Sequence, residues 1–203
     1  MNCLTIGGGP SVNNYKRKDL AALAKKCYTL AVNYACFEFE CEIVVACDYQ
    51  WIIDNKRNLL KLGKPIITRK WPVLKGIGLD LIEMPNDCVL KYRLSGMLAA
   101  KLGDALGGCI NKTSYVIGLD NTPGHFYDKT SDCSKIVTLG DYAAMGLCNT
   151  VNLGGKASLI NCWPKEDFLP DIKNASESDR YYAQLALAQL GRELLAGYKK
   201  DFI

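Results

Sequence analysis

The chain has 203 residues, of which 49% are hydrophobic, and a formal net charge of +4. This length supplies one sizeable core, which excludes two independent domains, and we expect a single domain over residues 1–203. Apolar runs such as 43–47 are strand-sized, and Met1-Asn2-Cys3 lacks the charged start of a signal peptide. We therefore expect no membrane span and a cytoplasmic protein.

The ten cysteines form no CxxC pair and fall in apolar strands or expected helices. This pattern indicates reduced, buried thiols instead of a disulfide framework. With one histidine in the chain, a zinc site would depend on thiolates at irregular spacing, and we expect no metal ligands.

Positive charge is concentrated in the first part of the chain. Residues 1–75 carry 12 Lys or Arg against 6 Asp or Glu, so the remainder is net negative. The excess favours an anionic ligand, and a phosphate-bearing small molecule explains it as well as nucleic acid does. Nucleic acid stays open as an acceptor, although no helix-turn-helix or zinc-finger pattern is present.

The first half of the sequence alternates strands with helices. Strands are expected at 3–6, 28–33, 42–47 and 65–68, helices at 17–26 and 49–62, and a short element at 34–40. Such alternation is typical of a parallel sheet, and unbroken apolar runs indicate strands covered on both faces. We predict an α/β, Rossmann-like open sheet, mostly parallel, with helices on both faces.

Residues 69–92 interrupt this alternation with Trp71-Pro72 and further turn-forming residues, and we interpret them as a lid or a small hairpin. Regularity returns with a helix from the N-cap Ser95 to a stop at Gly107. The remaining elements are a strand at 114–119, a loop at 121–128, a short helix near 141–148, strands at 150–153 and 158–162, and a C-terminal helix at 178–200.

A glycine-rich loop comes directly after the first strand. Gly7, Gly8 and Gly9 can adopt positive φ and leave no Cβ between backbone N–H groups and an anion. Pro10 stiffens the exit, and Ser11 can cap the next element of the chain. This layout is typical of a nucleotide-phosphate loop, but a strand-to-helix turn that binds nothing has the same appearance.

The loop does not match the dinucleotide fingerprint. Val12 occupies the position of its third glycine, and the second strand ends in Asn33 in place of an acidic ribose ligand. Both features argue against an oxidoreductase.

Polar residues end the other strands as well. Asn33, Asp48 and Asp120 each end a strand, and His125 lies in the loop after Asp120. Ligands of open parallel sheets bind at the carboxyl ends of strands, so these residues are candidates for a site. Simpler roles remain: Asn33 and Asp48 as helix caps, Asp120 in an Asx turn, and His125 in ordinary hydrogen bonds.

The order of these motifs over residues 3–164 resembles bacterial sialyltransferases that use CMP-sialic acid, related phage proteins, and the archaeal 6-hydroxymethylpterin pyrophosphokinases. The matching segments are Leu-Thr-Ile-Gly-Gly-Gly-Pro-Ser-Val at 4–12, Ala-Val-Asn at 31–33, the strand ending in Asp48, Leu-Ser-Gly-Met-Leu-Ala-Ala-Lys-Leu at 94–102, Tyr-Val-Ile-Gly-Leu-Asp at 115–120, Gly-His-Phe-Tyr at 124–127, and Leu-Ile-Asn-Cys at 159–162.

The resemblance implies roles for particular residues. The nucleotide donor would be held by the glycine loop and Asn33, with Ser95 and Gly96 near it. His125 would be the general base on the acceptor hydroxyl, and Tyr127 would assist the leaving phosphate. An imidazole titrates near neutral pH, so its neutral form can accept such a proton. The chain has Gly8 where the sialyltransferases carry an asparagine, so the resemblance does not specify the donor.

Three functions are compatible with this pattern. The first is a metal-independent, glycosyltransferase-like enzyme that uses a nucleotide donor as substrate, needs no cofactor and acts on an unidentified acceptor. The second is a Mg²⁺-dependent pyrophosphokinase acting on a pterin-like substrate, with Asp48 and Asp120 as the metal ligands. The third is a non-catalytic phage-type protein that binds a nucleotide or a host protein. A homo-oligomer is compatible with each.

Overall fold

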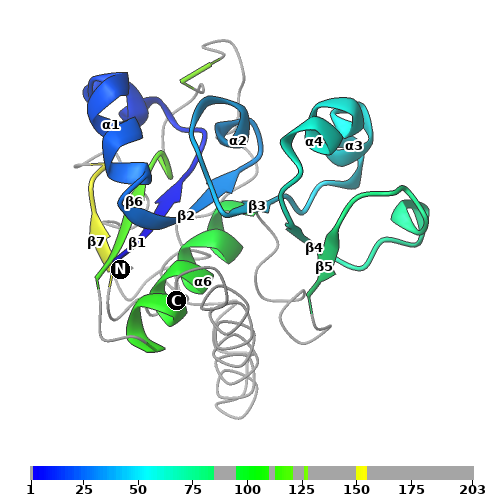
Figure 1. Ribbon diagram of the computed structural model, residues 1–203. Coiled ribbons are helices and arrows are strands. Elements are labelled where there is room, and N and C mark those ends of the chain that lie inside the picture. The colour runs from blue at the N-terminus through cyan, green and yellow to red at the C-terminus, as the bar shows by residue number, and fades with distance from the viewer. Residues whose placement is uncertain (1, 85–94, 110–112, 121–125, 128–149, 155–203) are drawn as a thin grey trace, which may run out of the picture.

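Seven parallel strands form the centre of the fold in the computed structural model, which describes residues 2–84, 95–109, 113–120, 126–127 and 150–154 (Figure 1). Their order across the sheet is β5-β4-β3-β2-β1-β6-β7, and every pairing is parallel. The strands are β1 (Asn2–Ile6), β2 (Cys27–Val32), β3 (Ile43–Val45), β4 (Ile66–Thr68), β5 (Leu81–Glu83), β6 (Ser114–Ile117) and β7 (Thr150–Asn152). The predicted open, parallel α/β sheet is confirmed.

Helices cover both faces of the sheet because its strands are apolar on both sides. The helices are α1 (Arg17–Ala24), α2 (Ala35–Glu38), α3 (Tyr49–Asp54), α4 (Lys56–Leu62) and α6 (Ser95–Cys109), with the 3-10 turns η1 (Pro10–Asn14) and η2 (Pro72–Leu74). Leu30 and Val45 belong to the core under α6, whereas Leu4 belongs to the core under α1 to α4. Figure 1 shows α6 on the side of the sheet opposite α1 and α2.

A glycine allows α6 to lie close to the central strand. A Cβ on Gly103 would come within 2.8 Å of Thr5 Oγ1 in β1. The Thr5 hydroxyl also donates a hydrogen bond to the backbone oxygen of Ala99, at 3.3 Å. The helix is thereby seated directly on the strand that leads into the glycine loop.

The structure corrects three details of the sequence prediction. The helix expected at 49–62 is divided into α3 and α4 at Asn55, whose side-chain amide donates to the backbone oxygen of Trp51, at 2.9 Å. The segment 81–83, expected in a lid or hairpin, is instead the edge strand β5, which pairs with β4 in parallel and so cannot be a hairpin arm. The helix from Ser95 continues through Gly107 to Cys109, because a glycine inside a helix costs only about 1 kcal/mol relative to alanine.

Several further expectations lie outside the described residues. These are the remainder of the proposed lid from 85 onward, the short helix near 141–148, the strand at 158–162 and the helix at 178–200. Among the described cysteines, Cys3, Cys27, Cys36, Cys41 and Cys47 are buried and form no disulfide. Within the described part of the chain, no helix has the length and apolar character needed to cross a membrane.

Candidate functional site

The strand order reverses its direction between β1 and β6. The chain proceeds outward from β1 to β5 on one side, and then returns to place β6 against the other side of β1. Open α/β sheets bind ligands at the carboxyl ends of the strands at such a reversal, which we call the β1–β6 edge. Residues 7–11 and 118–120 flank this point.

The backbone donors of the glycine loop are already used within the protein. The N–H of Gly7 donates to the backbone oxygen of Ile117, at 2.8 Å, and the N–H of Gly9 donates to that of Gly118, at 2.7 Å. The N–H of Ser11 donates to Oδ2 of Asp120, at 2.5 Å. These three amides are therefore not free for a phosphate, in contrast to the sequence expectation.

The need for glycine here is close packing. A Cβ on Gly7 would overlap the backbone of Gly118, and one on Gly9 would overlap the carboxylate of Asp120. Gly118 itself has a φ of +74°, a conformation that favours glycine. The loop does hold an anion, but that anion is the protein's own Asp120 side chain.

Asp120 is an acid with a perturbed pKa at the β1–β6 edge. Burial raises its pKa, and hydrogen bonds from the amide and hydroxyl of Ser11 oppose that rise. Its second oxygen, Oδ1, is buried without a hydrogen-bond partner. The Ser11 hydroxyl also accepts from the N–H of Gly118, at 3.1 Å, so it joins the two loops and does not act as a helix cap. A shifted acid at a sheet's ligand edge is a candidate functional group.

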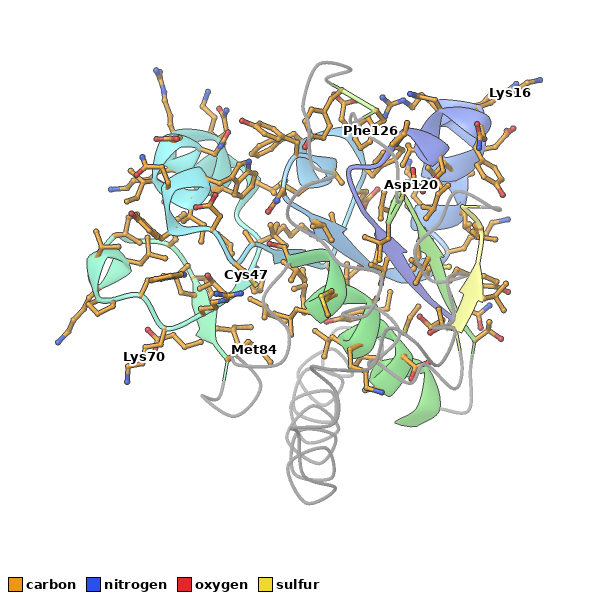
Figure 2. The ribbon with its side chains drawn as sticks, turned by 180° about the vertical axis from the view of Figure 1, so that it is seen from behind. Lys16, Cys47, Lys70, Met84, Asp120 and Phe126 are labelled. Carbon is orange, nitrogen blue, oxygen red and sulfur yellow. The ribbon has the colours of Figure 1, made fainter. Side chains whose placement is uncertain are left out.

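The segment after Asp120 returns to the same glycine loop. The N–H of Phe126 donates to the backbone oxygen of Gly8, at 2.8 Å. Asp120 and Phe126 lie near each other in Figure 2, beside α1. Both ends of the segment that carries His125 are thus fastened to the glycine loop. His125 itself is outside the described residues.

The ring of Tyr127, in the loop after β6, contacts a ring in the loop after β2. Its ring centroid lies 4.8 Å from that of Tyr34, with an angle of 53° between the rings. Tyr34 is preceded by Asn33, which has a φ of +48° and a buried side-chain oxygen without a partner. Asn33 therefore caps no helix through that oxygen, and it directly precedes the tyrosine that contacts Tyr127.

Asp48 takes the simpler of its two predicted roles. Its Oδ1 accepts from the N–H groups of Gln50, at 2.9 Å, and Trp51, at 3.4 Å, as the N-cap of α3. It lies after β3, and three strand intervals, about 14 Å at the usual spacing, separate β3 from β6. The sheet therefore does not bring Asp48 and Asp120 together around one Mg²⁺ ion.

Ser95 and Gly96 also lie away from the β1–β6 edge. The Ser95 hydroxyl accepts from the N–H of Cys47 after β3, at 2.8 Å, and Gly96 is buried in the first turn of α6. Burial raises the pKa of the Cys47 thiol, while Arg69 and Ser95 lower it. Figure 2 shows Cys47 apart from Asp120 and Phe126. Ser95 thus links α6 to β3, two strands from β1.

Sequence reasoning missed Tyr34 and Gly118. Tyr34 comes directly after a strand-end asparagine, and Gly118 lies two residues before a strand-end aspartate. Those positions could have drawn attention to both, but their contacts depend on which strands are neighbours. Comparison of the chain with protein-family models, with curated proteins and with solved structures found no match.

Proposed function

We propose that this chain is a nucleotide-binding, glycosyltransferase-like enzyme that acts without a metal ion, with its substrates at the β1–β6 edge of the sheet. One observation carries the proposal: Asp120 and Phe126, at the two ends of the His125 segment, are both hydrogen-bonded to the glycine loop. His125, the only histidine of the chain, directly precedes Phe126 in the sequence, and open parallel sheets bind ligands at this edge.

His125 is the proposed general base. As the acceptor oxygen forms its bond to the sugar carbon, the bond from that carbon to the donor phosphate breaks, and the acceptor proton passes to the imidazole. A neutral imidazole suits this transfer near pH 7. The leaving nucleotide departs with the electron pair of the broken bond, and hydrogen-bond donors stabilise its charge without a metal.

The donor phosphates would be held by side chains at the rim and not by the loop amides. The amides of Gly7, Gly9 and Ser11 already donate to Ile117, Gly118 and Asp120, so they hold the loops after β1 and β6 together. We assign Asp120 to positioning, because its hydrogen bond from Ser11 ties the glycine loop to the strand that precedes His125. Tyr127 packs its ring against Tyr34, and we assign it no role at the leaving phosphate. The separation of Asp48 from Asp120 gives no support to the pyrophosphokinase alternative.

Thermal denaturation with CMP, UDP, GDP, ADP, ATP and their sugar conjugates, with and without Mg²⁺, tests nucleotide binding directly. A ligand that binds the native state raises the midpoint temperature with the logarithm of its concentration. We expect a shift that chelator does not remove. A shift that requires Mg²⁺ would favour the pyrophosphokinase, and no shift with any nucleotide would contradict the proposal.

A transfer assay with the best donor then tests His125. We expect His125→Ala to abolish transfer while nucleotide binding stays nearly unchanged, with Asp80→Asn as an exposed-site control. Equal activity of His125→Ala and the natural protein would remove the assignment of the base. Binding without turnover over a panel of acceptors would favour the non-catalytic alternative.

A further inference from the structure

Two partly exposed tyrosines meet between the loops that follow β2 and β6, the two strands on either side of β1. Tyr34 is 39% exposed and Tyr127 is 38% exposed, although both are large aromatic residues. They come from the loops after β2 and β6, and their ring centroids are 4.8 Å apart. Aromatic rings left open to solvent at a ligand-binding edge are typical of a recognition surface.

The pair is held in place by other rings. Trp51 of α3 meets Tyr34 edge-on, at 5.5 Å between centroids and 90°. Phe126 meets Tyr127 edge-on, at 4.9 Å and 89°. Because each tyrosine ring packs against a neighbouring ring, little conformational entropy is lost when a ligand packs on the exposed part of the pair.

Positive charge lies next to this aromatic pair. The Arg17 guanidinium lies 4.7 Å from the ring centroid of Phe126, the residue before Tyr127. Arg17 also contacts Glu38 at 3.5 Å, but both side chains are about half exposed and such pairs bind weakly. A planar ring attached to a phosphate would use the tyrosines and the cation together, whereas a neutral sugar would gain nothing from the charge.

We propose that Tyr34 and Tyr127 form a stacking platform for the heterocyclic base of a nucleotide. The inference rests on the proposed function and assigns the base to a particular part of its site. Every base has a π face, and stacking on an aromatic side chain contributes enough for truncation to alanine to weaken binding about fivefold or more.

Trp51 supplies a reporter, because its indole contacts Tyr34 directly. The experiment monitors its fluorescence in the full chain during titration with AMP, GMP, CMP and UMP, and with ribose 5-phosphate, which has the phosphate but no base. We expect saturable quenching by at least one nucleotide and much weaker binding of ribose 5-phosphate. Equal affinity for ribose 5-phosphate would overturn the platform.

Substitutions of the two tyrosines test whether the nucleotide base binds on them. Tyr34→Ala and Tyr127→Ala should each weaken nucleotide binding about fivefold or more, whereas Tyr34→Phe and Tyr127→Phe should bind as the natural protein does, since stacking requires the ring. Tyr127→Leu retains apolar volume without an aromatic face, and it replaces Tyr127→Ala if that variant fails to fold. Tyr49→Ala is the matched control, because Tyr49 is 37% exposed but packs on Trp71 away from the pair.

The possible results distinguish failure of the stacking platform from failure of the proposed enzymatic function. Nucleotide binding and transfer that are unaffected by loss of either tyrosine ring would overturn the platform and leave the proposed function intact. Failure of every nucleotide to bind, by fluorescence and by thermal shift, would overturn both. Quenching by an oligosaccharide, with none by nucleotides, would also overturn the platform.

Discussion

The backbone N–H of Ser11 donates a hydrogen bond to Oδ2 of Asp120, across 109 residues of sequence. This bond joins the loop after the first strand to the loop after β6, and it places a carboxylate where a phosphate loop would hold its ligand. Four predictions test this arrangement and the packing around it.

Asp120→Asn should change how stability depends on pH. Because the pKa of Asp120 is raised on folding, the native state binds a proton that the unfolded state has lost between the unfolded value, about 3.9, and the folded one. This group's contribution to the free energy of unfolding is therefore present below about pH 3.9 and is lost as pH rises through the folded pKa. Urea unfolding from pH 4 to 7 should show Asp120→Asn gaining stability relative to the natural protein as pH rises.

Asp80→Asn provides the control for that series, because Asp80 is exposed in the connection to β5. The raised pKa would be contradicted if the free energy of unfolding of Asp120→Asn, relative to that of the natural protein, were constant from pH 4 to 7. It would also be contradicted if this advantage of Asp120→Asn grew toward low pH. Burial also raises the pKa of Glu42. Because Glu42 is present in both proteins, its contribution to the free energy of unfolding cancels when the two are compared.

Gly9→Ala should lower the free energy of unfolding by about 1–3 kcal/mol, because the new methyl group meets both the Asp120 carboxylate and the Gly118 backbone. The double variant Gly9→Ala with Asp120→Ala should recover part of that loss, since one of the two obstacles is gone. Chemical denaturation measures both. Strictly additive effects would show that the methyl group and the carboxylate do not meet.

Ser95→Ala should cost about 1–3 kcal/mol of unfolding free energy, because it leaves the buried N–H of Cys47 without its acceptor. The matched comparison is Asp48→Ala, which removes the exposed N-cap of α3 and should cost about 1 kcal/mol. Urea unfolding compares the two. A Ser95→Ala variant as stable as the natural protein would mean that water or another group replaces the hydroxyl.

Cys36 and Cys41 should resist alkylation in the native protein. Burial raises the pKa of Cys41 to about 12 and raises that of Cys36 as well. A shift of this size leaves about a thousandfold less thiolate near neutral pH, and the thiolate is the reactive form. Iodoacetamide labelling and then peptide mass spectrometry, in buffer and in urea, measure the difference. Equal labelling of these peptides in both conditions would contradict their burial.

The local pattern predicted the type of most elements in the first half of the chain. Apolar runs such as that of β2 indicated strands covered on both faces, and the place of Asp48 before a helix indicated its capping role. The division of the helix at Asn55 was missed because the apolar pattern runs through both α3 and α4. The edge strand β5 was missed because Gly76, Gly78 and Pro85 surround a strand of three residues.

The sequence by itself determined a parallel α/β sheet and the polar residues at its strand ends, because alternating elements and strand termini are local properties of the chain. Only the tertiary structure decided which of those ends are neighbours. The order β3-β2-β1-β6 separates Asp48 from Asp120, fills the glycine loop with the Asp120 carboxylate and brings Tyr127 to Tyr34. Strand order is set by burial and pairing between distant segments, and no local period in the sequence records it.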